Sequence, residues 1–325
     1  MLHLWIGRAG AGKTARVLET IKKNRTRHGQ ILIVPEHVSH EAEVALCHAL
    51  GDTASRNAEV LSLRNLSGRV LGEVGGLSDF TLDGGGKLLT MRMALQEVGS
   101  SLHVFNNPSR RAAFLEQLVA LVDELYAYEI PPQELYAQVQ DVPGQEGDKL
   151  RDVALLYAAY DARLRSGGRD ARSRVQKLRD ALPQASYLRG KDVYFDGFSY
   201  LNKTEEGILL TALTQAESVT VTLLGDRSAT EIFQNALRQR QRLVRMAQQT
   251  GCRCTMEFME PAGNTPLAHL EKYFFGAAVP TREGGGDQVR LYEATTAYAE
   301  VEYVSAQIRQ MLRGGYRCRD IAVTA

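Results

Sequence analysis

Residues 7–14, with the sequence GRAGAGKT, constrain the fold of this chain more than any other segment. The octapeptide fits the pattern G-x-x-x-x-G-K-[ST]. An apolar stretch at residues 2–6 precedes it and a helical pattern follows it, which is the setting in which this pattern forms a phosphate-binding loop. The sequence therefore predicts a strand, a glycine-rich loop and a helix in succession, as in α/β proteins with a parallel sheet.

Each part of this loop has a physical role in holding a nucleoside triphosphate. The glycines and alanines let successive N–H groups turn inward, and these groups form an anion cradle at the positive end of the next helix. Lys13 would reach the β- and γ-phosphates, and Thr14 would place its hydroxyl on Mg²⁺, so ATP and Mg²⁺ are the expected ligands. The predicted nucleotide-binding residues are Gly7, Ala9, Gly10, Ala11, Gly12, Lys13 and Thr14.

Apolar segments along the rest of the chain predict further strands separated by helices. Strands are expected at 31–34, 193–195, 219–224 and 254–258, and helices at 13–27, 39–50, 203–216 and 229–250. Residues 63–185 carry apolar side chains three or four positions apart, which predicts a large helical insertion. After the glycines at 284–286, the pattern predicts a helix over 298–313 and a last strand over 320–324. Because the chain ends on this strand, we expect the natural protein to continue.

Asp196 is the predicted acidic partner of Thr14 in the Mg²⁺ shell. It ends the apolar run 192–195 and leads into a loop, where P-loop ATPases place such a residue. In helicases of the RecA-like type a glutamate follows this aspartate and activates the attacking water, whereas Gly197 follows it here. A strand-end aspartate also serves as a turn or helix-cap residue, so this alternative stays open for Asp196.

Gly225 and Asp226 end the next apolar run, where superfamily 1 helicases carry Gly-Asp-x-x-Gln. The glutamine of that motif senses the γ-phosphate, and Ala229 stands in its place. Gly-Asp is also a common turn pair, so a purely structural role is equally open. The sequence thus combines a complete binding loop with the loss of two residues that couple ATP to hydrolysis.

These motifs, taken in order, resemble the start of the AddB family, the B subunits of the bacterial AddAB helicase–nucleases. The segments that carry the resemblance are residues 7–14, IVPEH at 33–37, VLSL at 60–63, RVLGEVGG at 69–76, FDGF at 195–198, TEE at 204–206, EVEYV at 300–304 and DIAV at 320–323. Residues 85–185 match only in helical character. His37 is a departure, since the family more often carries glutamine there.

The resemblance implies an α/β fold, a P-loop RecA-like parallel sheet of the superfamily 1 helicase type with a large all-helical insertion. The implied parts are the first part of the P-loop RecA-like domain at 1–70, the helical insertion at 71–188, the second part of the RecA-like domain at 189–283, and the start of a following helicase-like region at 284–325.

For function, the resemblance implies a component of an ATP-dependent helicase/exonuclease in double-strand break resection and recombinational DNA repair. It implies a heterodimer with an AddA-like helicase/nuclease partner, and DNA as a ligand, both single strand and duplex end. In this family the AddB component has a helicase fold without motor activity and helps to read the recombination hotspot. The nuclease domain and its iron–sulfur cluster would lie outside these 325 residues, so no catalytic residue is assigned here.

In RecA-like helicases the loops after the second and fourth strands face DNA. The predicted nucleotide-sensing or DNA-facing residues are Pro35, Glu36, His37, Ser39, Gly225 and Asp226. Arg238, Arg240, Arg242 and Arg245 could add positive charge, although such a run is more often a solvated helix face. The basic cluster at 22–28 is more often a complement to the helix dipole.

Composition limits these interpretations only weakly. The net charge of +1 neither requires nor excludes nucleic acid. The four cysteines are expected to be reduced thiols, and no apolar run approaches the roughly 20 residues of a membrane span. The chain has no basic leader, so a cytoplasmic location is expected. Two alternatives stay open: a catalytic P-loop phosphotransferase, and an ATP-independent assembly module with a vestigial loop.

Overall fold

The computed structural model divides the chain into two compact units, Met1–Pro261 and Ala262–Ala325. It describes residues 1–24, 29–51, 54–76, 82–105, 112–166, 174–227, 231–260, 263, 265–274, 279–284 and 288–324. The boundaries predicted from the sequence at 70, 188 and 283 stay predictions.

The first unit is built on six parallel strands in the order β3-β2-β4-β5-β1-β6. The strands are β1 Leu2–Gly7, β2 Gln30–Ile33, β3 Ala58–Leu61, β4 Asp192–Phe195, β5 Ser218–Leu224 and β6 Cys254–Met259. This sheet confirms the predicted α/β fold class. Because all strands run in one direction, the loops that follow β1, β4 and β5 meet at the same edge of the sheet.

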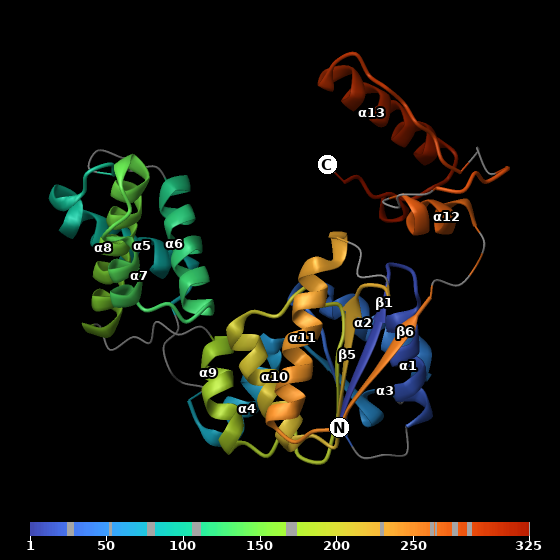
Figure 1. Ribbon diagram of the computed structural model, residues 1–325, viewed down its shortest axis with the longest axis horizontal. Helices are drawn as coiled ribbons and strands as arrows, with labels where there is room; N and C mark the ends of the chain where they lie inside the picture. Colours follow the sequence, from blue (N-terminus) through green and yellow to red (C-terminus); the bar gives the residue numbers. More distant parts are fainter. Residues whose placement is uncertain are drawn as a thin grey trace. The chain divides into compact units, whose positions relative to one another are not determined.

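Helices cover both faces of the sheet, as Figure 1 shows. On one face lie α1 (Lys13–Lys23) and α2 (Ser39–Leu50), and on the other lie α4 (Leu63–Val74), α9 (Arg174–Ala181), α10 (Lys203–Gln215) and α11 (Gln234–Gln249). Alternation along β1 explains the two cores: Leu4 packs with the second group of helices, whereas its neighbour Trp5 packs with the first. Strands buried on both faces account for the nearly continuous apolar runs in the sequence.

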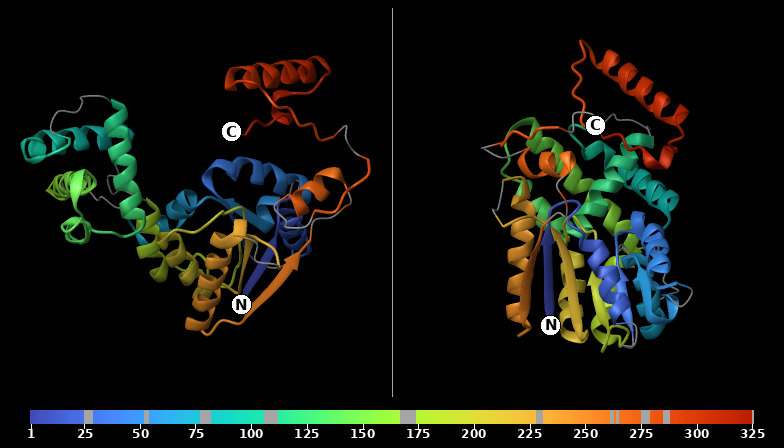
Figure 2. Two further views of the ribbon diagram at one scale, coloured as in Figure 1. Left: turned by 45° about the horizontal axis from the view of Figure 1, so that its top comes forward. Right: turned by 90° about the vertical axis from the view of Figure 1, so that its right-hand side faces the viewer.

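The predicted helical character of residues 63–185 is confirmed. Between the two parts of the sheet the chain forms α5 (Gly84–Val98), α6 (Ala112–Ala127), α7 (Pro132–Val139) and α8 (Gly144–Ser166), which Figure 2 shows as a group of packed helices. They share a core of their own, around Met91, Leu118 and Tyr157. A short helix, α3 (Ala54–Asn57), precedes β3.

The second unit contains α12 (Pro266–Tyr273) and α13 (Ala297–Arg313), and α13 confirms the helix predicted over 298–313. The strand predicted over 320–324 is wrong. Cys318–Asp320 form a 3₁₀ turn and residues 321–324 have no regular structure. A strand exists only through hydrogen bonds to a neighbour, and in the described part of this unit no strand lies beside these residues.

Two helix limits also differ from the sequence prediction. The helix expected at 229–250 begins at Gln234, after a 3₁₀ turn at Glu231–Phe233. The helix expected at 13–27 has its C-cap at Asn24, and the rest of its predicted span falls outside the described residues. None of the described helices has the length and apolar character that crossing a membrane requires.

Candidate nucleotide site

The GRAGAGKT segment connects the carboxyl end of β1 to the start of α1, as predicted. Gly10 and Gly12 adopt φ angles of 75° and 77°, in the left-handed region that only glycine enters without cost. A Cβ atom on Gly7 would lie 2.8 Å from the Ala11 Cβ and 2.9 Å from the Met259 carbonyl oxygen. The loop geometry therefore needs glycine at three positions for two separate reasons, backbone conformation and close approach.

Lys13 is held on the loop that precedes it. Its Nζ donates to the carbonyl oxygens of Gly7 at 2.6 Å and Arg8 at 2.8 Å. These bonds bend the side chain back over the loop, so its positive charge lies next to the backbone that forms the cradle. The outer part of the loop, at Ala9, Gly10 and Gly12, is exposed to solvent. An anion therefore has access to the loop.

Asp196 and Thr14 lie in direct contact, although 182 residues separate them in the chain. The Thr14 hydroxyl donates to Asp196 Oδ2 at 2.7 Å, and the Thr222 hydroxyl donates to Oδ1 at 2.6 Å. The carboxylate is 4% exposed, so these two hydroxyls fix its orientation. Sequence reasoning missed Thr222, and the signal that could have found it is a buried polar residue near the carboxyl end of an apolar strand.

The hydroxyl of Thr14 and the carboxylate of Asp196 form a donor set that suits Mg²⁺, which prefers hard oxygen ligands. Thr14 lies on the solvent-exposed side of this pair and Asp196 on the buried side. Within the described residues no group of three or more histidine, cysteine, aspartate or glutamate side chains could hold a metal ion by itself. Any cation here would thus share its coordination with a ligand such as a phosphate.

Gly197 directly follows Asp196, and its backbone conformation disfavours any side chain. Its φ angle is 81°, and its N–H donates to the Thr222 hydroxyl at 3.4 Å. A Cβ atom there would lie 3.5 Å from Pro35 Cδ, an ordinary contact. Space is therefore available, and the restriction comes from the left-handed backbone alone.

This geometry predicts the effect of substitutions at Gly197. Gly197→Ala should lower the free energy of unfolding by about 1–2 kcal/mol, since an L-residue avoids the left-handed region. Gly197→Asn should cost less, because asparagine tolerates that region. Denaturant unfolding of both variants tests this order. Equal stability of the alanine variant and the wild type would show that the left-handed conformation is not required.

Asp226 is joined to the phosphate loop rather than facing open solvent. Both Nε and Nη2 of Arg8 donate to Asp226 Oδ2, at 3.2 and 2.8 Å. The same guanidinium lies 5.4 Å from the centre of the Phe233 ring, just before α11. Arg8 was not predicted, because nothing local in the sequence marks a contact across 218 residues. The ion pair ties the loop after β1 to the loop after β5.

The remaining predicted residues are distributed as follows. Pro35 lies next to Gly197, and the turn Glu36–Val38 follows at the carboxyl end of β2. Glu36 and His37 are exposed, and Ser39 donates to the Glu36 carbonyl oxygen at 2.9 Å. No bond between these residues and the phosphate loop is among the contacts of the described residues. Ala229 lies outside the described residues. All four cysteines are free thiols.

Fold and site together define a class: an α/β protein with a RecA-like parallel sheet, a G-x-x-x-x-G-K-T loop at its carboxyl edge, and a helical insertion. Comparison with known proteins narrows this class. Residues 4–271 match the family described as "ADDB, N-terminal", and the chain belongs to this family.

The similar curated proteins are named as the B subunits of ATP-dependent helicase/deoxyribonucleases. The protein from Geobacillus thermodenitrificans is 29% identical over 99% of this chain and 30% of its own length. The protein from Pelotomaculum thermopropionicum is 33% identical over 98% of this chain and 29% of its own length. A protein from Clostridium perfringens is 27% identical over 99% of this chain and 29% of its own length. The chain therefore spans about 30% of the length of these relatives.

Proposed function

We propose that this chain is the nucleotide-binding, helicase-like region of an AddB-type component of an ATP-dependent helicase/deoxyribonuclease, and that it binds Mg-ATP without acting as a motor itself. The observation that carries the proposal is the contact between Thr14 and Asp196, with Gly197 directly after it. It unites the parts needed to bind a triphosphate and its cation, and lacks the carboxylate that would activate water.

ATP would bind with its phosphates in the loop of residues 7–14. The backbone N–H groups of the loop, the start of α1 and the Lys13 ammonium would neutralise the phosphate charge. Thr14 and Asp196 would hold Mg²⁺, which would offset the negative charge of the phosphates. Thr222 would keep the Asp196 carboxylate in one orientation.

The loop after β4 supports the proposal that this chain is not a motor. Gly197 has no side chain, and neither Phe198 nor Ser199 is a base at neutral pH. Asp226 is engaged with Arg8, so the loop after β5 braces the phosphate loop. In this proposal the bound nucleotide stabilises one conformation of the protein, and its hydrolysis does not drive movement along DNA.

For the whole protein we propose the role that the relatives' name suggests, helicase and deoxyribonuclease activity together with a partner of the AddA type. Its setting would be resection of double-strand breaks and recombinational repair. Single-stranded DNA and duplex ends would be its substrates, and the exposed turn Glu36–Val38 at the carboxyl edge of the sheet is the proposed DNA-facing element. Such a protein would work in the cytoplasm.

Measurements of ATP binding and of ATP hydrolysis test the two parts of this proposal separately. Trp5, the only tryptophan of the chain, lies in β1, close to the phosphate loop, so energy transfer from it to a fluorescent ATP analogue reports binding. We expect saturable, Mg²⁺-dependent binding and no phosphate release above background, with or without single-stranded DNA. DNA-stimulated turnover by this chain would overturn the non-motor half. No binding at millimolar ATP would favour an assembly module with a vestigial loop.

A further inference from the structure

β6 is the outermost strand on one side of the sheet, and the edge along its length is open. β6 pairs with β1 on one side, and no strand among the described residues pairs with its other side. Its sequence, CTMEFM, has neither the lysine nor the proline with which many proteins protect an edge strand from pairing. Glu257 is the only charged residue of the strand. Its carboxylate forms an ion pair with Arg16 of α1, on the face of the sheet opposite to α11.

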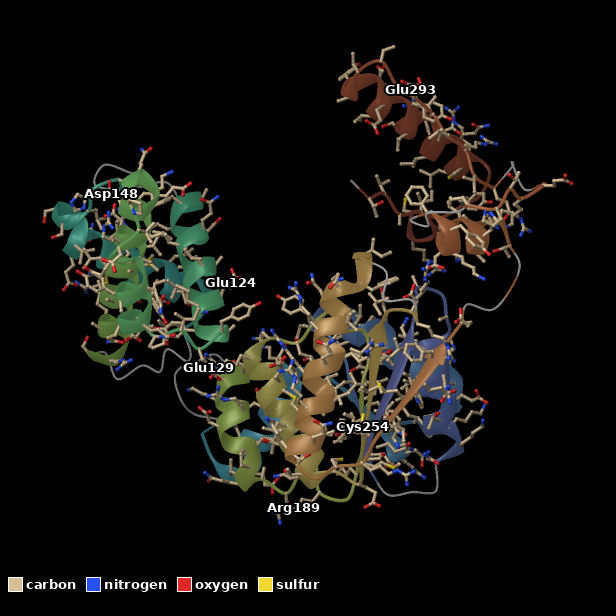
Figure 3. All side chains as sticks on the ribbon, viewed as in Figure 1. Glu124, Glu129, Asp148, Arg189, Cys254 and Glu293 are labelled. Carbon is tan, nitrogen blue, oxygen red and sulfur yellow. The ribbon has the colours of Figure 1, made fainter. Side chains whose placement is uncertain are left out.

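Backbone geometry shows which groups of β6 are available. The Leu2 N–H donates to the Arg253 carbonyl oxygen at 2.8 Å, so the backbone groups of Arg253 point toward β1. Along a strand the N–H and C=O of successive residues point to alternate sides. Those of Thr255 and Glu257 therefore also point to β1, and those of Cys254, Met256 and Phe258 point to the open edge. Figure 3 labels Cys254, the first residue of this strand.

Side chains of β6 alternate between the two faces of the sheet as well. Thr255 contacts His3 through a 2.7 Å hydrogen bond between its hydroxyl and Nδ1, and burial lowers the pKa of the His3 imidazole, which favours its neutral form. This contact and the Arg16–Glu257 pair anchor β6 to β1 and α1. Met256 and Phe258 instead lie on the α11 face, and Met256 is 52% exposed.

A groove of about 490 Å³ runs between α11 and β6 on that face. Its lining is Arg240, Gln241, Val244, Arg245, Gln248, Met256 and Phe258. Apolar side chains form part of it, arginines stand along it, and none of these described lining residues is acidic. The guanidinium groups of Arg227 and Arg240 lie 5.2 and 5.7 Å from the centre of the Phe258 ring. The arginines of α11 were predicted only as a charged helix face.

We propose that this groove binds an extended segment of a partner protein, which adds to β6 as a further strand and carries both apolar and acidic side chains at every second position, on the side that faces α11. The backbone groups at the open edge would pair with the segment. Val244, Met256 and Phe258 would accept its apolar side chains, and Arg240 and Arg245 its carboxylates.

A polypeptide fits this groove better than a nucleic acid. Bases would need a free aromatic face on which to stack, but two guanidinium groups already lie against the Phe258 ring. The open strand edge offers backbone donors and acceptors in the spacing of another strand, which a nucleic acid does not use. Positive charge alone would suit either ligand, so the test includes both.

The test uses fluorescence anisotropy of this chain with three labelled probes. They are a peptide that repeats valine-threonine-glutamate-threonine, so that valine and glutamate share one face of the strand, the same peptide with lysine for glutamate, and a thymidine oligonucleotide. The acidic peptide should bind at least about ten-fold more tightly than the basic one, a difference of about 1.4 kcal/mol. Arg245→Glu should weaken the acidic peptide by about ten-fold, the size of one lost charged hydrogen bond.

A matched pair at Met256 isolates the strand edge. Met256→Pro removes an N–H that the sheet does not use, so the chain should still fold but bind the acidic peptide at least about ten-fold more weakly. Met256→Ala keeps the N–H and should cost less. Equal binding of the two peptides, an unchanged affinity of the folded proline variant, or competition for the groove by the oligonucleotide would each overturn the proposal. Should the proline variant not fold, Arg245→Glu decides.

Discussion

Replacing Lys13 by alanine is expected to reduce the stabilisation of this chain by Mg-ATP to half or less while leaving its fold unchanged. The Lys13 ammonium donates to two loop carbonyl oxygens and is the only positive side chain that the loop directs back onto itself within the described contacts. A hydrogen bond to a charged group contributes about 1.5–3 kcal/mol. Loss of the bond from the Lys13 ammonium to the triphosphate should therefore weaken ATP binding by about 10- to 150-fold. Lys13 is only half-buried and its two bonds go to loop carbonyl oxygens rather than into either core, so the alanine variant should remain folded.

Thermal melting with and without 1 mM Mg-ATP measures this effect. For a dissociation constant near 10 μM the wild type should gain about 2.7 kcal/mol, and the Lys13→Ala variant should gain only about 0.3–1.4 kcal/mol. Lys22→Ala is the matched control, because it removes an exposed lysine from the same helix without touching the loop. An undiminished nucleotide response of the Lys13 variant would place the binding site elsewhere on the chain.

The sequence was sufficient for those parts of the site whose geometry is local. The strand before Gly7, the loop and α1 are contiguous, and the residue types that the loop needs follow from backbone conformation alone. Asp196 was also predictable, because an aspartate that ends an apolar strand lies at the carboxyl edge of any parallel sheet. For these residues, local chain geometry and the common direction of parallel strands replace knowledge of the contacts.

Contacts between distant segments were not predictable. Thr222 meets Asp196, and Arg8 meets Asp226, only because β4, β5 and β1 are neighbours in the sheet. No single sequence gives that order. The strand β3 was missed because its apolar residues run directly into the apolar pattern of α4, and the strand over 320–324 was expected from composition without a partner to pair with.

The position of β6 at the edge of the sheet could not be predicted from the sequence either. The apolar pattern predicted a strand at 254–258, but it could not say whether that strand is central or at the edge. The difference decides function, because a central strand has no backbone groups to offer a partner. In the same way, a binding role for the arginines of α11 can be proposed only because the structure places them along the groove beside β6.

Replacing Asp196 by alanine should remove the dependence of ATP binding on Mg²⁺. The carboxylate is the one acidic group within hydrogen-bond distance of Thr14 among the described contacts, and it is almost fully buried. Without it, Thr14 and Thr222 lose their acceptor, and the cation would lose the anionic ligand that we propose for it. Affinity for Mg-ATP should then fall to that for ATP with a chelator, a loss of about 10- to 150-fold at about 1.5–3 kcal/mol.

Titration of a fluorescent ATP analogue with Mg²⁺ and with a chelator tests this expectation. Thr222→Val is the matched control, because it removes the hydroxyl that orients Asp196 Oδ1 but leaves the carboxylate in place. That variant should keep its response to Mg²⁺ and lose no more than about ten-fold in affinity, since a neutral hydrogen bond contributes about 0.5–1.5 kcal/mol. A full Mg²⁺ response in Asp196→Ala would mean that Thr14 and the phosphates hold the cation alone. In that case Asp196 would serve only to position Thr14, and the contact on which the nucleotide proposal rests would be structural.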